Sequence, residues 1–157
     1  MRPGLALKGI PMMDTRLSLA LEAGHVSLPE AGEIVVLGAA GQSLAGLPRE
    51  RLLVVCDDVV AARSYEAQGY AVRTELPDAA AGAVVMVPRG RLEGRVLFAH
   101  AARLTGGAIV VDGVKTDGID SHYKELRKRG ACSAAYSKAH GKIFSCTVAP
   151  DALADWR

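Results

Sequence analysis

Short apolar runs alternate with amphipathic segments along most of the chain. The runs at 33–37, 52–56, 70–74, 82–87 and 108–111 have the length and β-branched content of buried strands. Apolar residues at helical spacing predict helices at 15–23, 59–68, 90–104 and 119–129, and a glycine follows each of them within two residues. Asp14 and either Asp57 or Asp58 stand where N-caps belong. Strands that alternate with helices indicate an α/β fold with a parallel, doubly wound sheet.

The C-terminal part of the chain departs from this alternation. Two further strands are predicted at 132–136 and 142–148, and only the tight turn at 139–141 separates them. A parallel crossover needs a dozen or more residues, so the pair is expected to be antiparallel. The predicted fold is therefore a mostly parallel sheet that ends in a C-terminal antiparallel hairpin.

Composition limits the chain to one domain without a membrane segment. A chain of 157 residues, half of them hydrophobic, supports a single core, and its longest apolar runs are far shorter than the roughly 20 residues of a membrane helix. Residues 1–13 predict an irregular extension rather than a signal peptide. The three cysteines, at 56, 132 and 146, are expected to be free buried thiols in a reducing cytoplasm, neither disulfides nor a zinc site.

Positive charge is concentrated near the C-terminus. The chain carries a net charge of +2, but the segment 115–142 alone carries +4, a pattern typical of a surface that meets phosphate. The candidate RNA-binding residues in and around this segment's loops and helix are Lys115, Thr116, Lys124, Arg127, Lys128, Arg129, Lys138, His140 and Lys142. A second interpretation stays open, because the dipole of a helix at 119–129 favours basic residues in its last turns without any ligand. Asp112, Thr116 and Asp117 are likewise candidates for capping that helix.

A cofactor site is not expected in this chain. The loop after the first strand has glycines at 38 and 41 but not the G-x-G-x-x-G order, and 38–51 is too short for a phosphate-binding helix. Gly38, Gly41 and Asp57 are the candidates that remain for cofactor contacts. The four histidines are scattered, and no nucleophile has a base at a matching spacing. We therefore expect neither a metal site nor catalytic residues.

Two segments identify a family. With Asp112-Gly113-Val114-Lys115-Thr116-Asp117-Gly118-Ile119-Asp120-Ser121 and Ser137-Lys138-Ala139-His140-Gly141-Lys142-Ile143-Phe144, the chain resembles the N-terminal domain of bacterial 16S rRNA guanine-N2 methyltransferases, alphaproteobacterial type, within the methyltransferase small-domain family. The resemblance extends from about residue 14 to the C-terminus. It implies a Rossmann-like methyltransferase fold, whose last strand is antiparallel to the others.

The resemblance also implies a division of labour. In this family an N-terminal half has lost S-adenosylmethionine binding, and a catalytic half carries the glycine-rich loop and an Asn-Pro-Pro-Phe turn. This chain has Val87-Pro88-Arg89-Gly90 after its fourth strand, as a degenerate half would, because neither Asn nor Asp stands there to accept a hydrogen bond from a target amine. Residues 14–150 are then the degenerate domain, and 151–157 begin a linker or terminal helix.

The function implied is non-catalytic. The domain would bind 16S rRNA or the small ribosomal subunit and support a catalytic methyltransferase domain, supplied in cis or in trans, which would bind the S-adenosylmethionine. The alternative is a self-sufficient small-molecule enzyme that uses the loop 112–118 as its active site. RNA binding without S-adenosylmethionine binding distinguishes the first hypothesis from the second.

Overall fold

The computed structural model describes residues 15–157, so the expected extension at 1–13 and the expected cap Asp14 lie outside the described residues. The strands are β1 (Ile34–Leu37), β2 (Leu52–Val55), β3 (Ala71–Arg73), β4 (Gly82–Met86), β5 (Ala108–Val114), β6 (Ala131–Cys132), β7 (Tyr136–Lys138) and β8 (Gly141–Thr147). The α-helices are α1 (Arg16–Ala23), α2 (Val59–Ala67), α3 (Arg91–Thr105) and α4 (Ile119–Arg129). Three 3₁₀ helices complete the list: η2 (Arg49–Arg51), η3 (Lys115–Asp117) and η4 (Pro150–Trp156).

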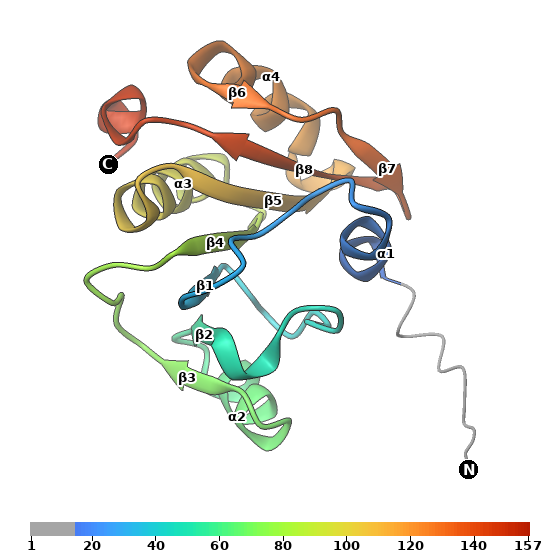
Figure 1. Cartoon of the computed structure of the whole chain (residues 1–157), viewed down its shortest axis with the longest axis vertical. Helices are drawn as coiled ribbons and strands as arrows, with labels where there is room; N and C mark the ends of the chain where they lie inside the picture. Colours follow the sequence, from blue (N-terminus) through green and yellow to red (C-terminus); the bar gives the residue numbers. More distant parts are fainter. Residues whose placement is uncertain (1–14) are drawn as a thin grey trace.

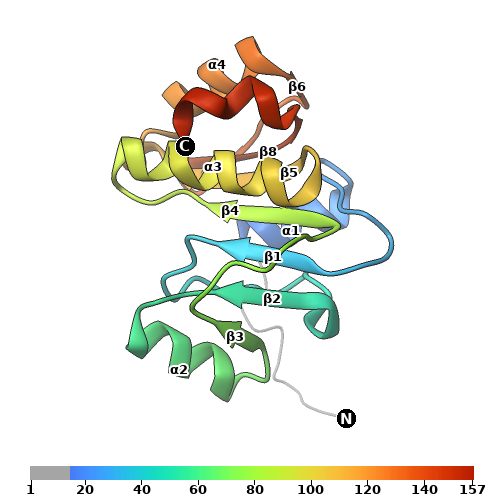
Figure 2. The same ribbon diagram turned by 90° about the vertical axis from the view of Figure 1, so that its left-hand side faces the viewer.

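All eight strands form one sheet in the order β3-β2-β1-β4-β5-β8-β6, with β7 also paired to β8 (Figure 1). The strands from β3 to β5 are parallel to one another, and β8 is antiparallel to β5, β6 and β7. The predicted α/β fold with a C-terminal antiparallel hairpin is therefore confirmed. Figure 2 shows the parallel strands stacked one above the next, with β8 behind α3.

Alternation of side chains along the strands divides the interior into two layers. Val35 and Leu37 of β1 face α3, α4 and η4, whereas Ile34 and Val36 face α1 and α2. Figure 1 shows α1 and α3 on opposite sides of the sheet. Helices thus cover both faces, which is the doubly wound arrangement that the sequence predicts.

Two of the crossovers between parallel strands are abbreviated. Between β1 and β2 the chain forms only η2, and residues 74–81, between β3 and β4, contain no helix. Leu44 and Leu47 from the first of these loops are buried in the same layer as α1 and α2. The prediction that 38–51 cannot hold a full helix is confirmed.

Helix starts differ from the sequence-based expectation. Thr15 caps α1, since its hydroxyl accepts from the N–H of Ser18 while the Ser18 hydroxyl accepts from the N–H of Thr15. Asp58 caps α2 as expected. The cap of α4 is Gly118, without a side-chain hydrogen bond, so the predicted capping by Asp112, Thr116 or Asp117 is wrong.

The strands near the C-terminus correct the prediction in two places. β5 continues to Val114, where Asp112 pairs with Ile143 and Gly113 with Lys142. The single strand predicted at 132–136 is two short strands, because the register on β8 shifts by one residue between the pairs Cys132–Cys146 and Tyr136–Ile143. An extra residue of this kind is a β-bulge, which interrupts the ladder.

The last residues form part of the core. Leu153 is fully buried and Trp156 is 5% exposed, packed against Phe98 of α3. The Arg95 and Arg129 guanidinium groups lie over the Trp156 ring at 5.0 and 4.2 Å from its centroid. Residues 151–157, expected to begin a linker or a terminal helix, lie in η4 and the residue after it.

Candidate functional site

A hollow of about 600 Å³ lies at the carboxyl ends of the parallel strands. It is lined by residues that follow β1, β2, β3 and β4, by the first turns of α3, and by Asp117 of η3. In open α/β sheets, ligands bind at this edge. We call it the carboxyl-edge hollow.

The two candidate glycines, Gly38 and Gly41, have different structural roles. Gly38 lines the hollow at φ 79°, and a Cβ at this position would lie 2.1 Å from the Met86 carbonyl oxygen of β4. Its small size therefore allows β1 and β4 to approach each other rather than a ligand to approach the backbone. Gly41 is outside the lining, and its N–H donates to the Tyr65 hydroxyl at 2.9 Å.

Of the two acidic residues after β2, Asp58 caps a helix and Asp57 is exposed without a hydrogen-bond partner among the described residues. The Asp58 carboxylate accepts from the Val60 N–H at 3.1 Å, as the N-cap of α2. Asp57 is exposed at the mouth of the hollow and forms no hydrogen bond or ion pair among those of residues 15–157. Of the three cofactor candidates, the structure thus places Gly38 and Asp57 at one hollow and Gly41 beside it.

The turn after β4 supplies Val87, Pro88 and Arg89 to the same hollow. No carboxamide or carboxylate stands in this turn, and the next acidic residue along the chain is Glu93, in the first turn of α3. His100 also lines the hollow, where burial and the neighbouring Arg103 lower its pKa. The hollow therefore combines an apolar floor with separate acidic and basic groups.

We call the basic residues around the β7–β8 turn, together with the neighbouring Thr116, the hairpin group. Its members are Lys115, Thr116, Lys138, His140 and Lys142. Within it, Lys138 lies on the α1 side of the sheet, as Tyr136 does, and Lys142 lies on the α4 side. The backbone N–H of Lys115 donates to the His140 carbonyl at 2.8 Å, so η3 is held against the turn. All members are exposed except Lys142, whose ammonium is 2.7 Å from the Asp120 carboxylate. That hydrogen bond lowers the pKa of Asp120.

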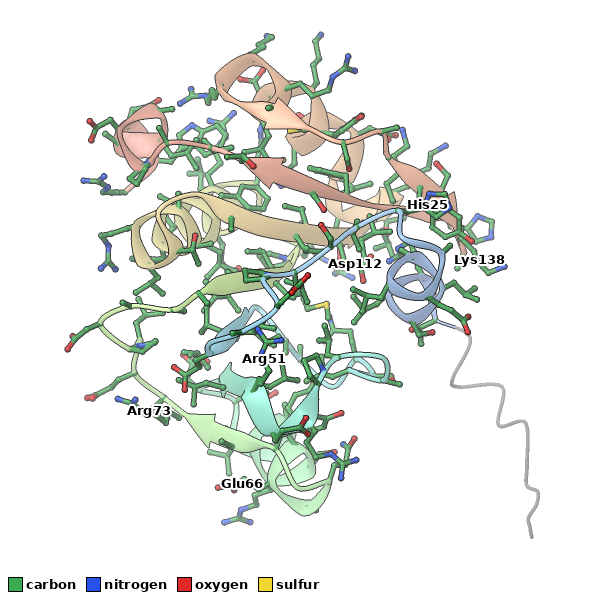
Figure 3. All side chains as sticks on the ribbon, viewed as in Figure 1. His25, Arg51, Glu66, Arg73, Asp112 and Lys138 are labelled. Atoms are coloured by element: carbon green, nitrogen blue, oxygen red, sulfur yellow. The ribbon has the colours of Figure 1, made fainter. Side chains whose placement is uncertain are left out.

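A buried ion pair holds the turn to the rest of the fold. Arg16 of α1 donates to the carboxylate of Asp112 on β5, and both side chains are about nine-tenths buried. The same guanidinium donates to the Lys138 carbonyl at 2.9 Å and to that of Ala139 at 3.4 Å. Burial raises the pKa of Asp112, and the Arg16 charge opposes this effect. Figure 3 shows Lys138 beyond α1 at the right-hand side of the molecule, and Glu66 of α2 near its lower end.

The basic residues of α4 are partly engaged within the fold. Arg129 makes two hydrogen bonds to Asp155, at 2.7 and 3.1 Å, and a third to the Ala152 carbonyl. Lys128 pairs with Glu125 at 3.2 Å, and Arg127 lies over the Tyr123 ring. Lys124, Arg127 and Lys128 line a shallow groove with Tyr123 and Asp120. Lys142 also lies over Tyr123, at 6.0 Å, and so joins this groove to the hairpin group.

The loop proposed as an alternative active site is largely not a loop. Asp112, Gly113 and Val114 are strand residues, and the carboxylate of Asp112 is committed to Arg16. A Cβ on Gly113 would lie 2.9 Å from Cβ of Val87, so this glycine permits close packing. Only Asp117 of the segment reaches the carboxyl-edge hollow.

Sequence reasoning missed Arg16, His122 and Tyr123. Arg16 could have been noticed, because a cation in the first turn of a helix opposes the helix dipole and implies a nearby carboxylate. His122 and Tyr123 fall on a helix with basic neighbours and carry no local signal.

Among residues 15–157, no group of three or more His, Cys, Asp or Glu side chains could hold a metal ion. Within the same residues, no helix has the length and apolar character needed to cross a membrane.

The sheet order, with β8 inserted antiparallel beside β5, defines the Rossmann-like methyltransferase class of fold. The sequence matches no protein-family model and no curated protein. Among solved structures, the 16S rRNA N2 G1207 methyltransferase (RsmC) of T. thermophilus, in complex with AdoMet and guanosine, is similar at a TM-score of 0.66 and 22% identity. The match covers 95% of this chain and 42% of that one, so this chain spans less than half of RsmC.

Two further structures have the same fold. Protein 1320 of Thermoplasma acidophilum is similar at a TM-score of 0.60 and 13% identity, over 85% of this chain and 86% of that one. A dimethyladenosine transferase from Plasmodium falciparum is similar at a TM-score of 0.52 and 9% identity, over 95% of this chain and 65% of that one. At these identities the likeness establishes the fold.

Proposed function

We propose that this chain is the non-catalytic N-terminal domain of an S-adenosylmethionine-dependent 16S rRNA guanine-N2 methyltransferase. It acts in the cytoplasm by binding 16S rRNA, free or in the small ribosomal subunit. It also supports a catalytic methyltransferase domain, in cis or in trans, which binds the cofactor. The likeness to a little under half of RsmC agrees with a chain that supplies one of two halves.

One observation carries the non-catalytic assignment. At the edge where a methyltransferase holds its reactants, the turn after β4 is Val87-Pro88-Arg89-Gly90, which has no side-chain acceptor for the hydrogen of an exocyclic amine. The abbreviated β1–β2 crossover adds to this, since it contains only the three-residue η2 and no α-helix N-terminus to bind an anionic group.

RNA binding is assigned to the hairpin group. Lys115, Lys138 and Lys142 come from η3, β7 and β8, and the Lys115–His140 backbone hydrogen bond and Arg16 hold these elements together. Lys115 and Lys138 have exposed ammonium groups that form no ion pair among the described residues. Phosphates are the expected ligands, because neutralising them releases counterions from the RNA.

The test replaces Lys115, Lys138 and Lys142 by Gln and measures the affinity for a 16S rRNA transcript over a range of salt concentrations. Each phosphate contact contributes roughly 0.7–0.9 to the slope of log affinity against log salt, so the slope should fall by about 2–3. The Lys115 and Lys138 substitutions should each change stability by no more than about 0.5 kcal/mol, because both positions are exposed. Loss of the Lys142–Asp120 ion pair should add no more than about 1 kcal/mol, because the pair is near the surface. A slope that stays unchanged in a folded variant would contradict the assignment.

Two controls make the result specific. Replacing Glu22, Glu50 and Glu66 by Gln changes three exposed acidic residues of α1, η2 and α2 that are not members of the hairpin group, and should leave the slope as it is. Replacing Lys124 and Lys128 by Gln tests the α4 groove separately. Loss of slope in the α4 variant alone would move the RNA contact from the hairpin to that helix.

A further inference from the structure

Cys132 and Cys146 are directly opposite each other on neighbouring antiparallel strands. The register of β6 and β8 pairs Cys132 with Cys146, and both side chains point to the layer of α3 and α4. The next pair in this register, Ser133 and Ser145, carries the inter-strand hydrogen bond from the Ser133 N–H to the Ser145 carbonyl at 2.8 Å. Cys132 and Cys146 therefore occupy a non-hydrogen-bonded position, where side chains approach each other most closely.

This geometry suits a covalent bond between the two side chains. A disulfide requires Cβ atoms about 3.5–4.5 Å apart, which is the range that close cross-strand pairs approach. Each thiol also affects the pKa of the other: Cys146 lowers that of Cys132, and Cys132 raises that of Cys146. The third cysteine, Cys56, lies elsewhere, with its thiol directed at the carbonyls of Ala39 and Asp58.

We propose that Cys132 and Cys146 are a redox modification site, which forms a reversible disulfide between β6 and β8 by exchange with a small-molecule disulfide such as oxidised glutathione. The three cysteines are free thiols in this structure. The site is independent of the proposed RNA role.

The two cysteines have unequal roles in this exchange. Cys132 is half-buried and near Arg127, and Cys146 lowers its pKa, so Cys132 is the thiolate that attacks first. It displaces one glutathione thiolate and forms a mixed disulfide. Cys146 is 3% exposed and its pKa is raised, so it does not meet the reagent directly.

Cys146 then completes the exchange. It loses its proton and attacks the sulfur of Cys132, which displaces the second glutathione. Two protein thiols are oxidised by two electrons, one glutathione disulfide is reduced to two thiols, and the two protons end on the released glutathione. The closed loop spans residues 132–146 and includes the whole β7–β8 turn. The disulfide therefore fixes the base of the hairpin that carries Lys138, His140 and Lys142.

The experiment treats the full chain with oxidised glutathione and maps its tryptic peptides without reduction. Trypsin cleaves after Arg129, Lys138 and Lys142, so the two cysteines fall in separate peptides, 130–138 and 143–157, and Cys56 falls in 52–63. We expect a product that has lost two hydrogens and a linked pair of the first two peptides, both restored by dithiothreitol. The melting temperature of the oxidised chain should rise by roughly 5–10 °C.

Variants separate the proposed pair from chance oxidation. Cys132→Ser should abolish the link and leave little glutathione on the protein, whereas Cys146→Ala should stop at a stable glutathione adduct on Cys132. Cys56→Ser should form the link as the natural chain does. A link that includes Cys56, a disulfide between two chains, or a glutathione adduct that persists on Cys132 of the natural chain would overturn the proposal.

Discussion

Single buried polar residues tie together segments that are distant in the sequence. Arg16 joins α1 to β5 and to the β7–β8 turn through Asp112 and two carbonyls. Breaking such a pair leaves an uncompensated charge in the interior, which costs more than the pair itself contributes. Arg16 therefore adds a side-chain connection to the β5–β8 pairing that positions the basic hairpin.

His122 is a second buried polar residue, and it is held neutral. It is 2% exposed, in edge-to-face contact with Phe98, and its Nε2 has no hydrogen-bond partner within residues 15–157. Burial lowers the pKa of His122, and the positive charges of Arg91 and Arg95 lower it further. Its imidazole also lies close to Gly94, where a Cβ would be 3.1 Å from Nε2.

This shift predicts a pH dependence of stability. The unfolded chain takes up a proton at His122 near pH 6.5, whereas the folded chain does so only at lower pH. The free energy of unfolding should therefore be highest above about pH 6.5 and should fall as pH decreases from there to the folded pKa. Urea denaturation between about pH 5.5 and 7.5 should show this slope in the natural chain and a smaller slope in His122→Gln.

Two matched variants test whether His122 causes this dependence of the unfolding free energy on pH. His100→Gln removes a second histidine with a lowered pKa and should reduce the slope in part. His140→Gln changes an exposed turn residue and should leave it as it is. If His122→Gln kept the full slope, burial of this imidazole would not be its source.

The β7–β8 turn combines a strained backbone with basic side chains. Ala139 and His140 have φ values of 52° and 58°, so both central residues of the turn are left-handed. This is a two-residue hairpin of type I′, in which Asn-Gly is the favoured pair. Ala and His occupy that conformation at a cost of roughly 1–2 kcal/mol per residue.

Replacing Ala139 by Asn and His140 by Gly should therefore stabilise the protein by about 1 kcal/mol. The Lys115–His140 contact is made by the backbone and is kept. Thermal unfolding of this double variant against the natural chain measures the effect, and Ala139→Val, which is β-branched and disfavours positive φ, should shift the melting temperature the other way. A lower melting temperature for the Asn-Gly variant would show that the turn is not under this strain.

The spacing of apolar residues predicted helix and strand bounds well for elements whose structure follows from that spacing. α4 begins and ends at the residues expected from its apolar spacing, and β1, β2 and β4 agree within one residue. The predictions fail where pairing with another strand determines the backbone conformation. Asp112 and Gly113 are residue types common in loops, yet pairing with β8 extends β5 through them. The bulge after Cys132 is likewise set by the register on β8, which no local signal records.

At the scale of the whole molecule, a hollow lies at the carboxyl edge of one continuous sheet. At this edge Gly38 packs against β4, and the β1–β2 crossover has no α-helix. Part of the positive charge predicted for segment 115–142 lies where η3 meets the β7–β8 turn. The sequence could not show which basic residues are available to a ligand, because Arg129 bonds to Asp155 and stacks on Trp156 within the fold.

These features predict that the isolated chain does not bind S-adenosylmethionine. A hollow of about 600 Å³ has room for a ligand, but affinity requires donors that converge on the ligand's charged groups, and neither a glycine-rich turn nor a helix N-terminus after β1 supplies them. Isothermal titration calorimetry of the folded chain with the cofactor should show no saturable heat at micromolar concentrations. Asp57→Asn, an exposed change at the mouth of the hollow, is the matched variant. Saturable binding by the natural chain that this variant abolishes would restore the hollow as a cofactor site and with it a catalytic role.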